Sequence, residues 1–279
     1  MNICPPFLYR YLKPTPEHLQ DIFQRRRLHF AEVDTLNDPF DCAIGLNLPP
    51  YHDISPKTMN LWKKYFSHLA MEDDPSLSLT ESQELAEQVI INGFPPKEIL
   101  ELKTGIRNLL KERARLTRVC CFSSTPRSPM MWAHYSDNHR GIVIQFDTRF
   151  MGDPLSNEIR CYKIKYSQYF PDLEEYLDAA DKAPDVFALL FLCRKSIEWQ
   201  AEKEWRFFTY DNEPYLGFCE KMVSGVIFGS DTKEGLKEEI KSWVSDWNNK
   251  PLFYNTTPSS TRFRMHITKH ISEPLNDQT

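Results

Sequence analysis

The sequence predicts a mixed α+β fold that is interrupted by a helical insertion, because two different periodicities occur along the chain. Short segments with alternating or continuous apolar character occur in residues 5–31 and again in residues 119–267, as is typical of strands. Between about residues 50 and 116, apolar residues instead recur every three to four positions, as they do along one face of a helix. We therefore expect a single domain over residues 1–270, with the insertion at about 50–116 and a flexible tail at 271–279.

The first part of the chain predicts two strands with a short helix between them. Residues 5–12 have the apolar and aromatic character of a strand. Thr15 and Pro16 then provide an N-cap residue and a proline at the first helical position. A second strand is expected at 28–31, and the turn-forming residues of 37–41 end it.

Three helices are expected in the insertion. The first begins at Ser55 and Pro56 and is ended by residues 73–75, which read Asp-Asp-Pro. Residues 80–83, with the sequence Thr-Glu-Ser-Gln, resemble a capping box that starts the second helix. Two prolines at 95–96 start the third.

Residues 119–147 combine two expected strands, at 119–122 and 142–147, with an unusual connection between them. The connection contains two prolines, several hydroxyl side chains, large aromatic and sulfur-containing side chains, and an arginine near either end. Loops held between strands commonly carry binding groups, so this composition indicates a site. Taken singly, however, each aromatic side chain is better explained as part of the core.

The last part of the chain returns to alternating strands and helices. We expect a strand at 160–166, an acidic loop around 172–175, an apolar helix at 184–196, strands at 204–208 and 224–229, an amphipathic helix at 231–247, and a final strand pair at 252–254 and 263–267. Within the strand 204–208, Glu204 and Arg206 would share one face.

Composition restricts the class of protein. A net charge of −5 and a pI near 5.9 argue against a general nucleic-acid-binding surface. Seven cysteines without a repeated Cys-x-x-Cys spacing are typical of reduced thiols. The longest apolar run, residues 186–193, is too short to span a bilayer, and no basic-apolar leader opens the sequence. We therefore expect a soluble cytoplasmic protein with no membrane partner.

Most standard catalytic signatures are absent from the sequence, including the phosphate-binding loops and the HExxH and GxSxG motifs. His134 and His139 have no partner at metal-ligand spacing, so no metal is expected. Two carboxylates remain, Glu202 and Glu204, which we expect on one strand face beside Arg206. Such a carboxylate suits the stabilisation of a developing positive charge. The structural alternative is that Glu204 forms a salt link with Arg206.

Three motifs resemble one bacterial family of domains of unknown function. They are NDPFD at residues 37–41, MWAHYSDNHRGIVIQFD at 131–147, and K-x3-W-x2-E-x-EWRF at 195–207. This resemblance covers most of the chain outside the insertion. The name of the family implies no activity.

A more distant similarity concerns the DarT-type ADP-ribosyltransferases, toxins that modify DNA. The order of the elements is similar, beginning with an aromatic-basic strand that carries Tyr9 and Arg10. Residues 122–131, with the sequence FSSTPRSPMM, resemble the F-x4-R-S-P-M-x stretch of those enzymes. They place a catalytic glutamate on a later strand, where Glu204 is the matching candidate and Glu202 the second. The similarity implies an ADP-ribosyltransferase-like fold of split, mixed sheets.

The same similarity implies NAD as the substrate and an ADP-ribosyltransferase or NAD-hydrolysing activity, in bacterial toxicity or phage defence. The acceptor would be a nucleic acid or a protein. A guanidinium would bind the diphosphate, with Arg10 as the candidate, and Tyr135 or Trp132 would stack on the nicotinamide ring. The implied NAD-binding residues are Tyr9, Arg10, Ser123, Arg127, Met131, Trp132, His134 and Tyr135.

We expect five of these candidates to line one concave site: Arg10, Arg127, Trp132, Tyr135 and Glu204. A different class of function is compatible with the same sequence. The acidic pI and the absence of a Gly-rich phosphate loop equally suit a non-enzymatic module that binds a nucleotide or a partner protein.

Overall fold

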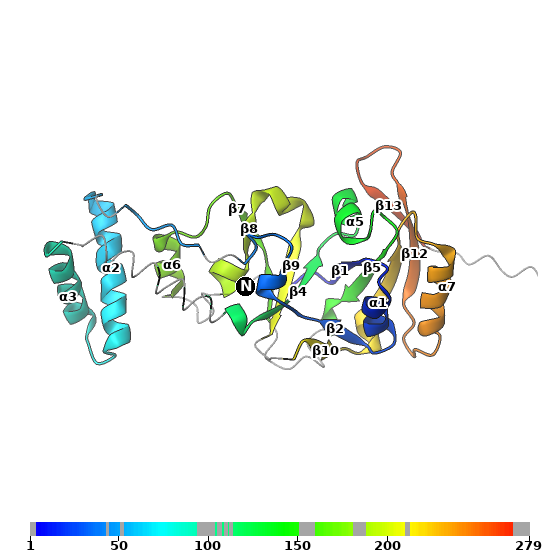
Figure 1. Cartoon of the computed structure of the whole chain (residues 1–279), viewed down its shortest axis with the longest axis horizontal. Coiled ribbons are helices and arrows are strands. Elements are labelled where there is room, and N and C mark those ends of the chain that lie inside the picture. The colour runs from blue at the N-terminus through cyan, green and yellow to red at the C-terminus, as the bar shows by residue number, and fades with distance from the viewer. Residues whose placement is uncertain are drawn as a thin grey trace, which may run out of the picture. The chain divides into compact units, whose positions relative to one another are not determined.

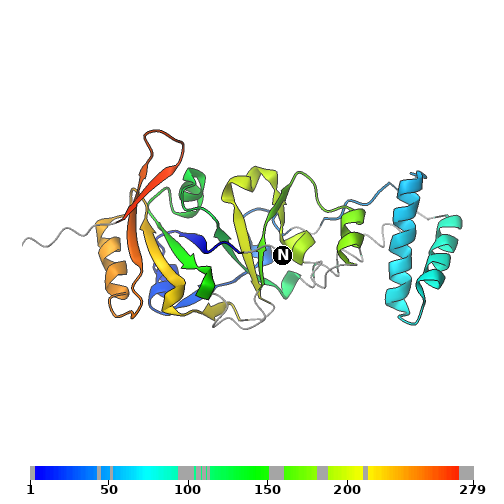
Figure 2. The same cartoon turned by 180° about the vertical axis from the view of Figure 1, so that it is seen from behind.

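The computed structural model describes residues 4–42, 45–50, 53–93, 104, 108, 111, 114–150, 160–180, 188–209 and 213–269. The chain forms two compact units (Figures 1 and 2). The first unit comprises Met1–Leu36, Leu116–Ile164 and Ile197–Thr279, and the second comprises Asn37–Arg115 and Lys165–Ser196.

A mixed sheet is the frame of the first unit. Its strands are β1 (Phe7–Leu12), β3 (Ala31–Glu32), β4 (Arg118–Ser123), β5 (Ile142–Asp147), β6 (Arg160–Lys163), β9 (Glu204–Thr209), β11 (Val223–Phe228), β12 (Leu252–Pro258) and β13 (Met265–Lys269). They follow the order β13-β12-β11-β5-β1-β4-β9-β6, with β3 beside β4. Only β11 and β12 run parallel; the other described pairs in this sheet are antiparallel. The predicted α+β class is therefore confirmed.

The sheet is joined at its middle by one residue pair. β1 pairs with β5 along its whole length, from Phe7 to Leu12, and β4 pairs with β9 equally completely. Between β1 and β4, however, only Tyr9 and Ser123 are partners. The two halves of the sheet therefore separate beside the second half of β1.

Helices cover the two faces of this sheet. Because successive strand residues point to opposite faces, Leu8 joins one buried cluster and Tyr11 another. The first cluster includes residues of α1 (Pro16–Phe23) and α7 (Glu234–Trp243), and the second includes Trp132 of α5 (Pro129–Tyr135). We call these the α1/α7 face and the α5 face. A separate two-stranded sheet pairs β2 (Arg27–His29) with β10 (Tyr215–Gly217).

The second unit is mainly helical. Its described helices are α2 (Pro56–Asp73), α3 (Leu79–Ile91), α6 (Leu173–Ala180) and a π-helical turn, η3 (Ala188–Leu192). Figures 1 and 2 both show α2 and α3 side by side. Trp62 and Tyr65 of α2 bury against Leu173 and Leu177 of α6. The second unit also contains two short parallel strands, β7 (Lys165–Ser167) and β8 (Arg194–Ser196).

Several predicted elements differ from those in the structure. The connection after β4 contains the helix α5, and the acidic segment at 172–175 begins α6 instead of forming a loop. The expected strand 160–166 divides at Ile164 into β6 and β7. The expected helix 184–196 is, in its described part, the turn η3 followed by β8.

Some of the predicted helix boundaries also differ from those in the structure. The capping box of α3 is formed by Ser78 and Glu81, two residues before the expected one, because Ser78 accepts a bond from the Glu81 amide and the Glu81 carboxylate accepts one from the Ser78 amide. The helix expected at 231–247 extends over Glu234–Trp243. The helix expected from residue 95 and the tail at 271–279 lie outside the described residues. In the part of the chain that is described, no helix combines the length and apolarity needed to cross a bilayer.

Candidate functional site

A cavity of about 300 Å³ lies where β1 separates from β4. Its wall comes from the second half of β1, from Lys13 directly after it, and from α1, β2 and α5: Arg10, Tyr11, Leu12, Lys13, His18, Asp21, Ile22, Arg27, His29 and Tyr135. We call it the split cavity. Arg10 projects from the α1/α7 face of the sheet and Tyr135 belongs to a helix on the α5 face, so the cavity receives side chains from both faces.

Positive charge dominates the wall of the split cavity. Arg10, Lys13 and Arg27 stand against one carboxylate, Asp21. Burial raises the pKa of Asp21, but hydrogen bonds from Arg25 and Arg27, each 2.8 Å long, outweigh that effect and lower it. Asp21 therefore remains ionised and is already neutralised by two guanidinium groups, so the cavity retains excess positive charge.

Arg10 points into this environment without a carboxylate partner among the described residues. Its Nη1 donates to the Cys120 thiol and its Nη2 to the His29 carbonyl at 3.4 Å, and its guanidinium lies 5.8 Å from the centre of the Phe122 ring. Burial lowers the pKa of His29, and the nearby Arg10 charge lowers it further. A guanidinium that has no carboxylate partner in the described part of the chain, and whose charge is not balanced nearby, is suited to binding an anion.

Tyr135 connects the split cavity to Glu202. The Tyr135 hydroxyl donates a 2.6 Å hydrogen bond to Glu202 Oε1. Glu202 is only 5% exposed and lines a small hollow together with Met131, His134, Tyr135 and Trp199. Ser128 caps α5 by accepting a bond from the Met131 amide, which fixes the helix that carries Tyr135.

The backbone around Glu202 is fixed by residues that follow β4. The Ser123 hydroxyl donates to the Glu202 carbonyl at 2.6 Å, and the Ser124 amide donates to the Lys203 carbonyl at 3.0 Å. Glu202 ends the 3-10 helix η4 (Ile197–Glu202), and Lys203 then has a left-handed φ of 48°. Glu202 and Glu204 were expected on one strand face, but only Glu204 lies in the strand, because the left-handed residue separates them.

Glu204 has a different environment. Its carboxylate accepts bonds from Arg206 Nε at 2.6 Å and from Arg206 Nη2 at 3.1 Å, and both side chains are buried. The pairs Tyr9–Ser123 and Ser123–Glu204 place these three residues in one row on the α5 face. Arg10, the neighbour of Tyr9, therefore projects from the opposite face.

The expected single concave site is consequently not present in the form predicted. The split cavity contains Arg10 and Tyr135, but Arg127, Trp132 and Glu204 do not line it. Trp132 is fully buried, donates from its Nε1 to the Pro126 carbonyl, and packs edge-on against Tyr11. It is a core residue, as its aromatic character alone indicated.

The remaining predicted residues lie on the α5 face. Arg127 Nη1 donates to the Met265 carbonyl at 3.2 Å. Burial raises the pKa of Tyr9, which lies close enough to Arg127 for that charge to oppose the shift. His134 is exposed and contacts Trp199 at 6.4 Å between ring centres.

Sequence reasoning missed Lys13, His18, Arg27 and His29 as members of the cavity. In the structure Arg27 and His29 alternate along β2 and so share a face, but the strand expected at 28–31 did not include Arg27. The convergence of that face with Arg10 could not be read from the order of the residues.

Comparison with known proteins gives one match. Residues 131–207, from α5 to β9, match the model of a family described as a protein of unknown function (DUF2971). The predicted resemblance to a family of unknown function is thereby confirmed over a narrower region than expected, which includes the second and third motifs but not NDPFD. No curated protein and no solved structure matches the chain. Over the ranges that the structure describes, no group of three His, Cys, Asp or Glu side chains is arranged to hold a metal ion.

Proposed function

We propose that this chain, which matches a family of unknown function over residues 131–207, binds NAD at the split cavity and cleaves the nicotinamide–ribose bond. The products would be nicotinamide and ADP-ribose, the latter transferred to a nucleic acid, a protein or water. The observation that carries the proposal is the position of Tyr135, which lines the cationic cavity and also donates to the Glu202 carboxylate.

The diphosphate is the part of NAD that suits the cavity wall. Arg10 offers a planar set of N–H donors, which bind phosphate oxygens in pairs, and Arg27 adds positive charge to the wall although its Nε and Nη2 already contact Asp21. Arg10 has no carboxylate to displace among the described residues, and Asp21 is already neutralised by its two arginines. Phosphate binding there would therefore proceed with little competition from internal ion pairs.

Glu202 is the better candidate for the carboxylate that assists bond cleavage. When the nicotinamide leaves with the electron pair of the glycosidic bond, positive charge develops on the ribose, and a fixed carboxylate stabilises it. Glu204 is held by Arg206 on both oxygens. Glu202 Oε1 accepts a hydrogen bond from the hydroxyl of Tyr135, a residue that lines the split cavity, so this carboxylate is linked to the proposed substrate site.

We propose in addition that the fold of the first unit is similar to that of the ADP-ribosyltransferases. An ADP-ribosyltransferase-like arrangement, with two half-sheets that open around the substrate, is supported by the single residue pair between β1 and β4. The position of Arg10 on β1 beside that opening is consistent with it.

A second candidate function is a nucleotide-binding module without catalysis. The burial of Glu202 favours it, because a carboxylate that is 5% exposed has little access to a substrate in this conformation. This module would use the same cationic cavity and would leave NAD intact.

Nicotinamide release separates the two functions. Wild type would be incubated with NAD and, in turn, single-stranded DNA, duplex DNA, RNA and protein acceptors. We expect nicotinamide release in at least one mixture. Glu202→Gln should slow this release roughly 100-fold or more, because it removes the negative charge that stabilises the cationic transition state.

Glu198→Gln provides the matched control, since Glu198 is an exposed carboxylate in the same turn. Its rate should equal that of wild type. Absence of nicotinamide in every mixture would reject the enzyme and leave the binding module. An unchanged rate in Glu202→Gln would reject the role of Glu202.

A further inference from the structure

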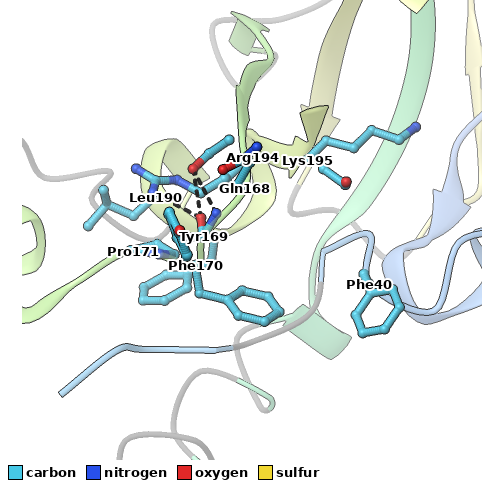
Figure 3. Close-up of a pocket in the computed structure, with 11 residues that line it drawn as sticks. Phe40, Gln168, Tyr169, Phe170, Pro171, Leu190, Arg194 and Lys195 are labelled. Carbon is cyan, nitrogen blue, oxygen red and sulfur yellow. Dashed lines mark hydrogen bonds between the residues drawn. The ribbon is translucent and has the colours of Figure 1, made fainter. Parts of the chain in front are cut away.

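The second unit contains its own cavity, of about 220 Å³, which the first unit's function does not use. Flat or apolar side chains form most of its wall: Phe40, Tyr169, Phe170, Pro171, Leu190 and Phe191. Figure 3 shows Arg194 among them, while the neighbouring Lys195 leaves the strand in the other direction. We call this the aromatic pocket.

Arg194 is the polar feature of the aromatic pocket. It is buried on β8, its Nη2 donates to Glu175 Oε1 at 2.6 Å, and its Nη1 makes a long 3.4 Å contact with the Tyr169 carbonyl. Its Nε has no hydrogen-bond acceptor within the residues described. A buried N–H without a partner is costly, so a ligand that supplies an oxygen acceptor at this point would be stabilised.

The charge around Arg194 favours an anionic acceptor. Glu175 is shared between two cations, Arg194 at 2.6 Å and Lys165 at 2.7 Å. The hydrogen bond from Arg194, opposed by burial and aided by Lys165, lowers the pKa of Glu175 to about 2. One carboxylate thus balances two cations in this group, and hydrogen bonds to a charged acceptor are the stronger kind.

The wall of the pocket favours a flat ring. Tyr169 is 72% exposed and Phe40 65%, so large aromatic faces meet solvent beside the cavity. Phe170 is held in place, because Asn47 Nδ2 donates to its carbonyl and because Gly45 has no side chain to collide with its ring. Aromatic faces pack well against other rings. The volume lies below the roughly 300–1,000 Å³ of sites for drug-sized ligands, so one ring fits.

We propose that the aromatic pocket binds a small aromatic carboxylate. The carboxylate pairs with the Arg194 guanidinium, and the ring packs against Tyr169 and Phe170. This site is independent of NAD binding, because every residue that forms it belongs to the second unit.

Titration with benzoate, followed by saturation-transfer NMR, tests the proposal. A ligand of about nine heavy atoms should bind in the millimolar range. Cyclohexanecarboxylate tests the need for a flat ring and benzyl alcohol the need for a charge, and each should bind roughly 5-fold or more weakly. If cyclohexanecarboxylate binds as tightly as benzoate, the pocket does not select a flat ring. If benzyl alcohol binds as tightly as benzoate, the pocket does not select a carboxylate.

Two variants locate the site. Tyr169→Ala removes an exposed ring and should weaken benzoate binding at least roughly 5-fold, whereas Phe263→Ala, which removes an exposed ring in the first unit, should not. Arg194→Lys should abolish detectable binding, because a lysine lacks the planar set of guanidinium donors. Trp62 is the only tryptophan of the second unit, so its fluorine NMR signal after 5-fluorotryptophan labelling reports whether that unit remains folded. Absence of benzoate binding to wild type, or unchanged binding in both variants, would reject the site.

Discussion

At the scale of single residues, two carboxylates only two positions apart serve different purposes. Glu204 is bound through both oxygens by a fully buried guanidinium, that of Arg206. Glu202 accepts a hydrogen bond from the Tyr135 hydroxyl and lines a small hollow. The difference arises because Lys203, in a left-handed conformation, separates a turn from a strand. A buried charge is costly when its counter-charge is removed, and Glu204 is the counter-charge of the buried Arg206. We therefore assign Glu204 a structural role.

Glu204→Gln should therefore destabilise the protein. Removing one partner of a buried ion pair leaves the other charge in a poorly compensated position, at a cost of about 3 kcal/mol or more. Urea unfolding measures the change in the free energy of unfolding. Glu238→Gln, which removes one partner of an exposed pair with Lys241, should change it by less than about 1 kcal/mol. A Glu204→Gln protein as stable as wild type would contradict this assignment.

His29 should make nucleotide binding depend on pH. In the free protein its pKa is lowered by burial and by the charges of Arg10, His18 and Arg118, and is only partly restored by Asp21. A diphosphate in the split cavity would favour the charged imidazole and raise that pKa. Binding should then take up a proton, so the affinity for NAD should increase as the pH falls through the range in which the bound His29 titrates.

Calorimetry in two buffers of different ionisation enthalpy measures this proton uptake. His29→Gln should reduce the uptake, and His68→Gln, outside the cavity, should not. Affinity that does not change with pH, with no proton uptake in wild type, would show that the diphosphate lies elsewhere.

At the scale of elements, the junction between β1 and β4 creates the candidate site. Six residues of β1 pair with β5, whereas Tyr9 alone pairs with β4. The second half of β1 is thus free on its β4 side, where Arg10 faces the split cavity. A fully paired β4 would close this opening.

The helix α5 is the other element that the site needs, because it carries Tyr135. Ser128→Ala removes its N-cap, which typically costs about 1 kcal/mol. We expect a lower melting temperature and a weaker affinity for NAD, since the Tyr135 position depends on this helix. Ser242→Ala, at an exposed position of α7, should change neither. Equal effects of the two substitutions would show that the cap does not support the site.

Periodicity predicted most of the sheet but not every helix. The strands β4, β5, β9 and β11 were predictable because each buries apolar side chains in a short, period-two or continuous run. The helix α5 was missed because its two nearby prolines indicated a loop, although Pro129 directly after Ser128 is also a favourable helix start. Glu174 and Glu175 likewise suit the first turn of α6.

At the scale of the whole molecule, distant segments meet in ways that a single sequence does not reveal. Within the second unit, Asp41 of the NDPFD motif forms a buried 3.1 Å ion pair with Lys195, the first residue of the K-x3-W motif. Within the first unit, Arg10, His18 and Arg27 come from three elements that enclose the split cavity. These residues were visible as types, but their convergence depends on long-range packing.

The central claim is that the split cavity binds the diphosphate of NAD through Arg10. Calorimetric titration of NAD tests it with three proteins: wild type, Arg10→Gln, and Arg140→Gln, in which a half-exposed arginine outside the cavity is replaced. We expect wild type and Arg140→Gln to bind equally, and Arg10→Gln to bind at least roughly 10-fold more weakly, because a charge-assisted contact to phosphate is lost. Wild-type protein that does not bind NAD, or Arg10→Gln that binds it as tightly as wild type, would contradict the account.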